Sequence, residues 1–250
     1  LSIRRQRQMC IRDRMNIGVN KFLVVAAELD DAHKIDKLIT NHKDLLYFTT
    51  GVHPHHAKGF NDQSTERMRN LIKKYSPNAL GEMGLDFFRN LSSHEEQKFA
   101  FEEQIKLAIE FNKPLFLHQR DSHEPFIKLL NNYKTDIDKA VVHCFTGTQL
   151  ELDEYLKCDF YIGLTGWICD ERRNKDLRSS IKNIPLNRLM LETDSPFLIP
   201  RNLNPKPKSN RNEPKNLMHI ATEIAQLRNE SVEEICNATY RNSLDFFSQA

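Results

Sequence analysis

Short apolar runs alternate with helical patterns from residue 15 onward, and this alternation constrains the fold more than any other feature. It is typical of βαβ units and predicts a parallel sheet covered by helices. The strands that we expect are 21–27, 46–52, 79–83, 114–118, 140–144, 159–164 and 188–193. The helices that we expect lie near 30–42, 62–75, 93–111, 122–133, 149–157, 170–182, 213–228 and 231–247.

A chain of 250 residues, of which 39% are hydrophobic, can bury one sizeable core. We therefore predict a single domain over 15–250, with the α/β fold of a TIM-type (β/α)8 barrel. Such a barrel needs eight strands, and seven are visible. Because 15–20 runs into the first expected strand without a helix, we expect one strand to be lost before Lys21. A barrel that is open at this edge is the alternative.

Residues 1–14 carry five arginines and one aspartate, without the apolar stretch of a signal peptide. We expect a foreign or disordered leader here, and a basic arm that binds nucleic acid is the alternative. The leader contributes +4 to a formal net charge of +2, so about −2 remains for the rest of the chain. Binding to nucleic acid would therefore depend on local patches of positive charge.

The cysteine content and the hydropathy pattern bear on the cellular location of the protein. Five cysteines without a CxxC pair are typical of a reduced intracellular protein, so we expect a cytoplasmic location. The sequence contains no run of about 18 apolar residues, so we expect no membrane-spanning segment and no membrane partner. A monomer is the default expectation.

Four expected strands end on a residue that can bind a metal ion or move a proton: Glu82, His118, His143 and Asp194. A lone histidine at the end of a buried strand is more often a core residue than a ligand. Two such histidines, joined by carboxylates on other strands, favour a metal site instead. The strand ends of an α/β barrel meet at one face, and this donor set suits a divalent ion.

Imidazole and cationic side chains near the same strand ends are candidates for contacts with phosphate. Three histidines within 53–56 fit either a metal site or a polar loop fixed by Pro54, and His55 is the best candidate for substrate. Arg120 lies two residues beyond His118, so both point to the same side of the strand. Arg173 lies in a charge run that fits a solvated face or a substrate contact.

The segment 200–214 supplies the positive patch that the net charge does not show. It carries Arg201, Lys206, Lys208 and Arg211 before its first acid, Glu213. Asn212 and Pro214 then predict the start of a helix, whose free N–H groups favour phosphate. Arg211 is therefore a further candidate for a phosphate contact.

Other polar residues near the strand ends are predicted to be structural. Asp86 lies in the loop after Glu82 and is expected to be a turn residue. Ser92 or Ser93, with Glu95 and Glu96, predicts a capping box at the start of the next helix. Asp121 is expected to cap the helix after His118.

The motifs resemble those of the TatD family of metal-dependent deoxyribonucleases, within the wider amidohydrolase-like barrels, over nearly all of 16–247. The runs that carry the resemblance are Thr50-Gly-Val-His-Pro-His55, Gly81-Glu-Met-Gly-Leu-Asp86, His118-Gln-Arg-Asp121, His143-Cys-Phe-Thr-Gly147, Gly166-Trp-Ile-Cys-Asp-Glu-Arg-Arg173, Glu192-Thr-Asp-Ser-Pro196 and Arg211-Asn-Glu-Pro214. Residues 16–20 are similar to the motif that this family carries on its first strand. We reject this match, because 18–34 fits the family's second strand and leaves no residues for the helix between the two strands.

The resemblance implies that Glu82, His118 and His143 are metal ligands, with Asp194 a further ligand or the general base. It implies Mg²⁺ as the ion, with Mn²⁺ or Zn²⁺ as alternatives, and hydrolysis of DNA, including 3′→5′ exonuclease action on single strands. The residues agree, since such a shell can activate water beside a phosphodiester. Two alternatives stay open, namely a hydrolase of a small ester, lactone or amide, and an inactive truncated fragment.

Overall fold

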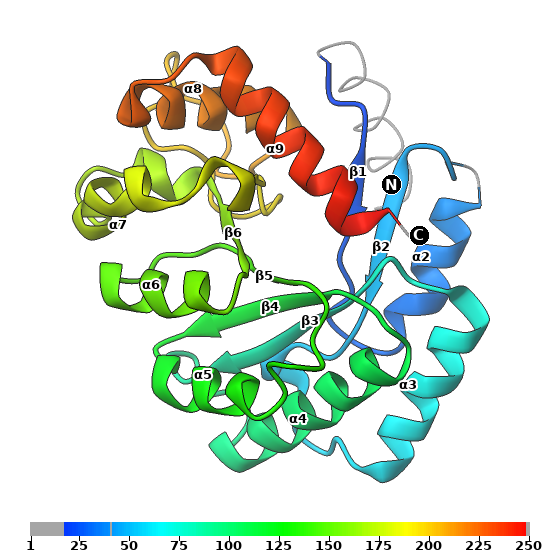
Figure 1. Ribbon diagram of the computed structural model, residues 1–250. Helices are drawn as coiled ribbons and strands as arrows, with labels where there is room; N and C mark the ends of the chain where they lie inside the picture. The colour runs from blue at the N-terminus through cyan, green and yellow to red at the C-terminus, as the bar shows by residue number, and fades with distance from the viewer. Residues whose placement is uncertain (1–17, 41, 249–250) are drawn as a thin grey trace. The chain divides into compact units, whose positions relative to one another are not determined.

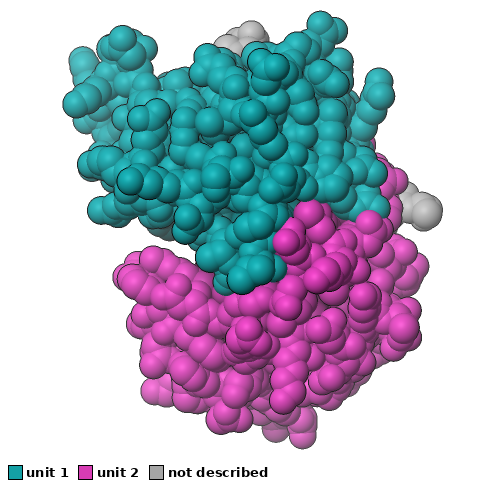
Figure 2. Space-filling model, turned by 60° about the vertical axis from the view of Figure 1, so that its left-hand side comes forward, with its two compact units in different colours: residues 1–22, 144–152, 162–243 teal, residues 23–143, 153–161, 244–250 magenta. Residues whose placement is uncertain are grey.

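The computed structural model describes residues 18–40 and 42–248, and these form two compact units (Figure 2). Unit 1 comprises 1–22, 144–152 and 162–243, and unit 2 comprises 23–143, 153–161 and 244–250. The leader expected at 1–14 lies outside the described residues, and so do 15–17 of the stretch before Lys21 where a strand was expected to be lost. The single domain over 15–250 stays a prediction.

Seven strands are found in the described part of the chain, each within a range expected from the sequence or overlapping it. They are β1 (Phe22–Val24), β2 (Leu46–Thr50), β3 (Ala79–Asp86), β4 (Leu115–Arg120), β5 (Ala140–Val142), β6 (Tyr161–Leu164) and β7 (Leu189–Leu191). Strands β1 to β5, which lie in unit 2 except for Phe22, follow chain order, and the pairs from β2 to β5 are parallel. In unit 1, β6 and β7 pair in parallel.

The helices also follow the expected pattern (Figure 1). They are α2 (Asp31–Ile39), α3 (Asp62–Tyr75), α4 (His94–Glu110), α5 (His123–Asn131), α6 (Gln149–Lys157), α7 (Lys175–Ser180), α8 (Leu217–Arg228) and α9 (Val232–Phe247). Short 3-10 turns lie at Pro54–His56, Gly166–Cys169, Ile181–Asn183, Leu186–Arg188 and Pro214–Asn216.

Two expected helices begin later than predicted. The helix expected at 170–182 begins as α7 at Lys175, because the Asp170 carboxylate accepts hydrogen bonds from Nε and Nη2 of Arg172 and holds a turn. The helix expected at 213–228 opens with a 3-10 turn, and α8 begins at Leu217.

The predicted cap of α4 is confirmed, whereas the predicted cap of α5 is wrong. The Ser93 side chain accepts from the Glu96 N–H, and the Glu96 carboxylate accepts from the Ser93 N–H in return. In α5, the N-cap position belongs to Ser122 rather than Asp121. The Ser122 hydroxyl donates to the Leu85 carbonyl at the end of β3 (2.9 Å), so it joins strand to helix.

Helix α4 packs on β3 and fixes two strand ends with buried glutamines (Figure 1). The Gln104 side chain accepts from the Val52 N–H (2.7 Å) and donates to the Val52 carbonyl (3.1 Å), just past β2. The Gln97 side chain makes the same pair of bonds with the Asp86 backbone, at 2.8 and 3.2 Å. Both glutamines are at most 1% exposed, so the strand ends are held by hydrogen bonds protected from water.

Unit 1 is organised around α8, which packs on β7 and on the turns Gly166–Cys169 and Ile181–Asn183. Arg178 Nη1 donates both to the Ile168 carbonyl (2.9 Å) and to Glu223 Oε1 on α8 (2.6 Å). This partly buried pair therefore ties α7 and the turn before it to α8.

Among the described residues, no helix combines the length and the apolar composition that are needed to span a membrane.

Candidate metal centre and substrate site

The local structure of β3 brings two carboxylates and an imidazole together. Side chains alternate along a strand, so Glu82, Gly84 and Asp86 share one face of β3. Gly84 pairs with His118 on β4, and a Cβ at Gly84 would lie 1.9 Å from the His118 carbonyl oxygen. The glycine, at a φ of +145°, therefore allows the close approach of β4 that places His118 between the two carboxylates.

A shift of register gives Glu82 its position. Leu80 pairs with Leu115, but Met83 pairs with Leu117, so the β3–β4 ladder is irregular at Glu82. The Glu82 N–H donates instead to the Ala26 carbonyl just beyond β1 (3.0 Å). Irregularities of this kind re-aim a side chain, and here Glu82 is the residue that they affect.

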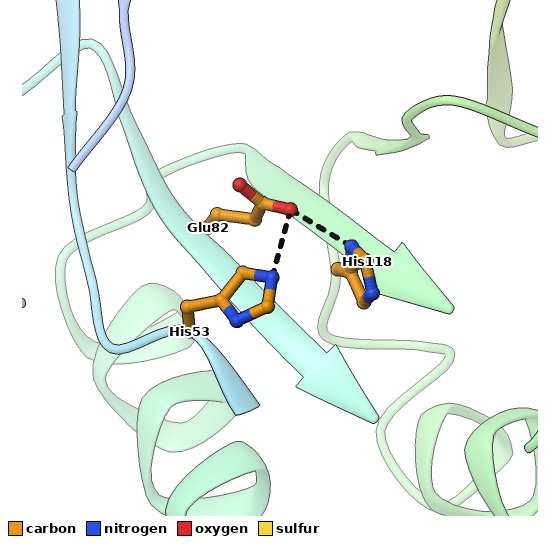
Figure 3. Close-up of side chains that lie close together, drawn as sticks. All are labelled: His53, Glu82 and His118. Carbon is orange, nitrogen blue, oxygen red and sulfur yellow. Dashed lines mark hydrogen bonds and ion pairs between the residues drawn. The ribbon is translucent and has the colours of Figure 1, made fainter. Parts of the chain in front are cut away.

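One oxygen of Glu82 collects three imidazoles, two of which are drawn in Figure 3. Glu82 Oε1 lies 2.7 Å from His143 Nε2, 2.8 Å from His118 Nδ1 and 3.4 Å from His53 Nε2. Burial opposes the charge of Glu82, but attraction from His143 and hydrogen bonds from the three histidines outweigh it and hold its pKa well below the usual range. Glu82 is therefore an anion among imidazoles.

His53 differs from the other two histidines in the direction of its ring. Its Nδ1 accepts a hydrogen bond from the His55 N–H (3.1 Å), so a neutral ring carries its proton on Nε2, facing Glu82. Burial lowers the pKa of His53, despite its contacts with Glu82, and so favours this neutral form. In this arrangement His53 Nε2 donates to Glu82 Oε1.

Asp86 is the second carboxylate of the site and is 1% exposed. Its Oδ2 lies 2.6 Å from His55 Nε2 and 3.5 Å from His118 Nε2, and its Oδ1 accepts from the Arg89 N–H (2.8 Å). Burial opposes ionisation of Asp86, but these contacts with His118, the Arg89 N–H and His55 outweigh it and keep its pKa well below the usual range. The same two carboxylates raise the pKa of His118 against the effect of burial.

The donor set fits a divalent cation. Ligand atoms of His53, Glu82 and His118 all lie within 4.8 Å of one another, and His143 contacts the same Glu82 oxygen. His118 Nε2 is buried and faces Asp86 Oδ2 at 3.5 Å, which is too far for a well-formed hydrogen bond. A carboxylate with imidazoles around it is a donor set for borderline divalent ions such as Mn²⁺ and Zn²⁺, and it also provides a carboxylate oxygen for Mg²⁺.

The remaining predicted site residues lie in both units. In unit 2, Arg120 pairs with Asp86 in the β3–β4 register and is exposed. In unit 1, Asp194 follows Thr193 after β7, and Arg173 and Arg211 are exposed. The roles predicted for these residues stay predictions.

Asn212 fixes the backbone on either side of Asp194. Its Nδ2 donates to the carbonyls of Thr193 (2.7 Å) and Leu198 (3.3 Å), and its N–H donates to the Pro196 carbonyl (2.9 Å). Its Oδ1 accepts from the Glu213 N–H and from Asn216 Nδ2, at 2.9 and 2.8 Å. Asn212 is 2% exposed, so this one amide joins the two ends of the cationic segment 200–211.

Sequence reasoning left His53, as one of three histidines, open between a metal site and a polar loop, and it placed Asp86 among turn residues. A usable signal exists for Asp86, because Glu82-x-Gly84-x-Asp86 puts both carboxylates on one face of a strand. For His53 the signal is a group of three histidines, and their individual directions depend on the Pro54–His56 turn.

A sequence profile described as "TatD related DNase" matches residues 2–248. The chain belongs to this family. The match begins at residue 2, so it gives no support to a foreign leader over 1–14. The chain is 42% identical over 241 residues to a protein of Pantoea ananatis named 3′-5′ ssDNA/RNA exonuclease TatD, covering 96% of this chain and 93% of that protein. A protein of the same name from Yersinia pseudotuberculosis is 45% identical over 230 residues, covering 92% and 88%.

Solved structures show the same fold. The crystal structure of YJJV, a TatD homologue from Escherichia coli, superposes with a TM-score of 0.88 at 28% identity, over 98% of this chain and 93% of that one. The phosphotriesterase homology protein of Escherichia coli superposes with a TM-score of 0.67 at 13% identity, over 99% and 91%, and bears on the fold alone. These likenesses confirm the predicted TIM-type α/β fold of the metal-dependent hydrolases.

Proposed function

We propose that this protein is a divalent-metal-dependent nuclease that removes nucleotides from the 3′ end of single-stranded DNA or RNA. The observation that carries this proposal is the convergence of His118, His143 and His53 on one oxygen of Glu82, among strand ends of unit 2. Membership of the TatD-related family and relatives named as 3′-5′ ssDNA/RNA exonucleases support the substrate and the polarity.

Glu82, His118 and His143 are the residues that would hold the metal, and Asp194 is a further ligand or the general base. A bound divalent ion would supply Lewis-acid chemistry, lowering the pKa of water and neutralising phosphoryl oxygens. Mg²⁺ is the ion that we expect, with Mn²⁺ or Zn²⁺ as alternatives. Asp86 orients His118 from the side opposite Glu82, at 3.5 and 2.8 Å respectively.

The protein's own groups then position the phosphodiester and move the proton. His55, held by Asp86 at 2.6 Å, and Arg120 are the proposed phosphate contacts of unit 2. Arg173 and Arg211 are the proposed phosphate contacts of unit 1. With Asp194 as the general base, the water oxygen forms the new bond to phosphorus and Asp194 accepts its proton. One bridging P–O bond of the phosphodiester breaks, and the departing oxygen takes up a proton from solvent water.

The first test is the digestion of a 5′-labelled single-stranded oligonucleotide with Mg²⁺, with Mn²⁺ and with EDTA. Removal of nucleotides from the 3′ end gives a ladder of labelled products that shorten one step at a time. The ladder should require metal and should be lost in Asp194→Asn and Glu82→Gln. Glu95→Gln, on the exposed face of α4, is the matched control and should leave the ladder unchanged.

Other outcomes would overturn the proposal. A ladder that persists in both variants would indicate a contaminating nuclease. A cooperatively folded protein that releases no nucleotide but hydrolyses a p-nitrophenyl ester would support the small-ester alternative. A protein that neither melts cooperatively nor is stabilised by metal would support the inactive fragment.

A further inference from the structure

The segment 87–93 between β3 and α4 carries an exposed aromatic side chain close in sequence to the candidate metal centre. Phe88 is 57% exposed and follows Asp86 by two residues. A single exposed apolar side chain needs no explanation by itself. Phe88 differs from an ordinary surface residue because a cation and several hydrogen bonds fix its surroundings.

Arg120 covers one face of the Phe88 ring. Its guanidinium carbon lies 3.8 Å from the ring centroid, within the range of a cation–π contact. The two residues meet because Asp86 and Arg120 are partners in the parallel register, and the Phe87 N–H donates to the Arg120 carbonyl (3.0 Å). The backbone directly before Phe88 is therefore anchored to the end of β4.

Asp86 and His94 hold the loop on both sides of Phe88. The Arg89 N–H donates to Asp86 Oδ1 (2.8 Å), and the Asn90 N–H donates to the Asp86 carbonyl (3.3 Å). The Phe87 ring stacks on His94, with centroids 3.5 Å apart and planes at 10°. The Phe88 backbone is thus fixed to the same Asp86 that contacts His55 and His118, so its place relative to the metal centre is set.

We propose that Phe88 and Arg120 form a subsite for one nucleobase of a single strand. The base stacks on the exposed part of the Phe88 ring, and the Arg120 guanidinium contacts the phosphate attached to that nucleotide. Exposed aromatic rings beside cations are how proteins hold unstacked bases without reading their sequence. The inference rests on the proposed function. It adds recognition of the nucleobase, which a metal centre that acts on the phosphate does not provide.

This subsite predicts which substrates are favoured. Every base has a π face, so all four bases of DNA or RNA should serve equally well. An abasic nucleotide has nothing to stack and should be a poor substrate at the position that Phe88 contacts. A base paired in a duplex is already stacked on its neighbours, so a blunt end should be poor as well.

The experiment combines Phe88 variants with abasic substrates. Single-stranded oligonucleotides carry one abasic nucleotide at the first, second or third position from the 3′ end, and kcat/KM is measured for each against the intact strand. For wild type we expect a loss of about tenfold at one of these positions, as base–aromatic stacking energies imply. Phe88→Ala should be about tenfold slower on the intact strand and insensitive to the abasic position.

Three further variants show whether the aromatic face is what matters. Phe88→Trp should keep the dependence on the base, whereas Phe88→Leu keeps apolar area without a π face and should behave like Phe88→Ala. Leu91→Ala is the matched control, because Leu91 lies in the same loop and is 62% exposed. Leu91→Ala should behave like wild type.

A binding measurement gives a readout that is independent of turnover. A strand with 2-aminopurine at the sensitive position and phosphorothioate linkages at its 3′ end should lose fluorescence on wild type, because stacking quenches this base. The loss should be absent with Phe88→Ala, and equal melting temperatures of the two proteins should exclude misfolding. If wild type digests strands but Phe88→Ala keeps both the quench and the base dependence, the subsite is wrong and the nuclease stands. If wild type releases no nucleotide from any strand, the proposed function itself fails.

Discussion

The imidazole–carboxylate cluster of unit 2 and the segment 193–212 of unit 1 are built in opposite ways. In the cluster, side chains satisfy one another, since Glu82 and Asp86 collect the imidazoles of four histidines. In the segment, one side chain satisfies backbone groups, since the Asn212 amide binds the carbonyls of Thr193 and Leu198.

The two regions also differ in where their charge lies. The carboxylates of the cluster are largely buried, and Asp86 is 1% exposed. The four cations of the segment are exposed: Arg201, Lys206, Lys208 and Arg211. Groups that do chemistry need a fixed geometry, which buried strand ends provide, whereas groups that attract a polyanion act over a distance and can stay in solvent.

The largest expected effect is at the cluster itself. Glu82→Gln removes the anion around which the imidazoles converge, so we expect metal-dependent nuclease activity to fall by about 10³-fold or more. Calorimetric titration with Mn²⁺ should show metal binding weakened in parallel. Retention of full activity together with lost metal binding would mean that the cluster is not the catalytic centre.

The next effect concerns the hydrogen bonds of the Asn212 side chain, which hold the segment 193–212 together. Asn212→Ala leaves two carbonyls, the Glu213 N–H and an Asn216 donor without this partner, so urea unfolding should show a loss of about 2–4 kcal/mol. Trypsin should also cut native protein faster after Lys208 and Arg211.

Asn202→Ala is the matched control for Asn212→Ala. Asn202 is an exposed asparagine of the same segment, with bonds to Glu223 and His219. Asn202→Ala should lower the free energy of unfolding by less than about 1 kcal/mol, as exposed polar substitutions do. Equal losses in the two variants would show that burial of the Asn212 amide is not what stabilises the segment.

A smaller effect concerns the exposed charges. Neutralising Lys206, Lys208 and Arg211 together to glutamine should lower kcat/KM on single strands about tenfold at low salt and flatten its dependence on salt, because fewer phosphate contacts release fewer counterions. The melting temperature should stay close to that of wild type. An unchanged salt dependence would contradict a role of this segment in binding nucleic acid.

The smallest effect is a pH dependence of the cluster. The pKa of Asp86 is lowered in the folded protein, so the unfolded chain binds more protons in acid and stability falls as pH falls through the ordinary range of an aspartate. In metal-free protein, Asp86→Asn should remove about 1 kcal/mol of this dependence between roughly pH 5 and pH 2. Urea unfolding at several pH values measures it, and identical slopes for both proteins would contradict the assignment.

The residue pattern alone predicted the order of strands and helices, with Glu82 and His118 on β3 and β4 and His143 directly after β5. The strand expected to end just after Glu82 in fact continues to Asp86. Local patterns suffice for the order, because apolar runs and helical periodicity act over a few residues. The Ser93–Glu96 cap was predictable for the same reason, since both partners lie within one turn.

How these side chains meet depends on contacts between strands and helices that are far apart in the sequence. The close approach at Gly84, the register shift at Glu82 and the glutamines of α4 all depend on partners distant in sequence. They turn Asp86 from a predicted turn residue into a buried partner of His55 and His118, and they aim His53 at Glu82. The direction of a polar side chain at a strand end is set by what packs against it, and the pattern of its own segment carries no record of that partner.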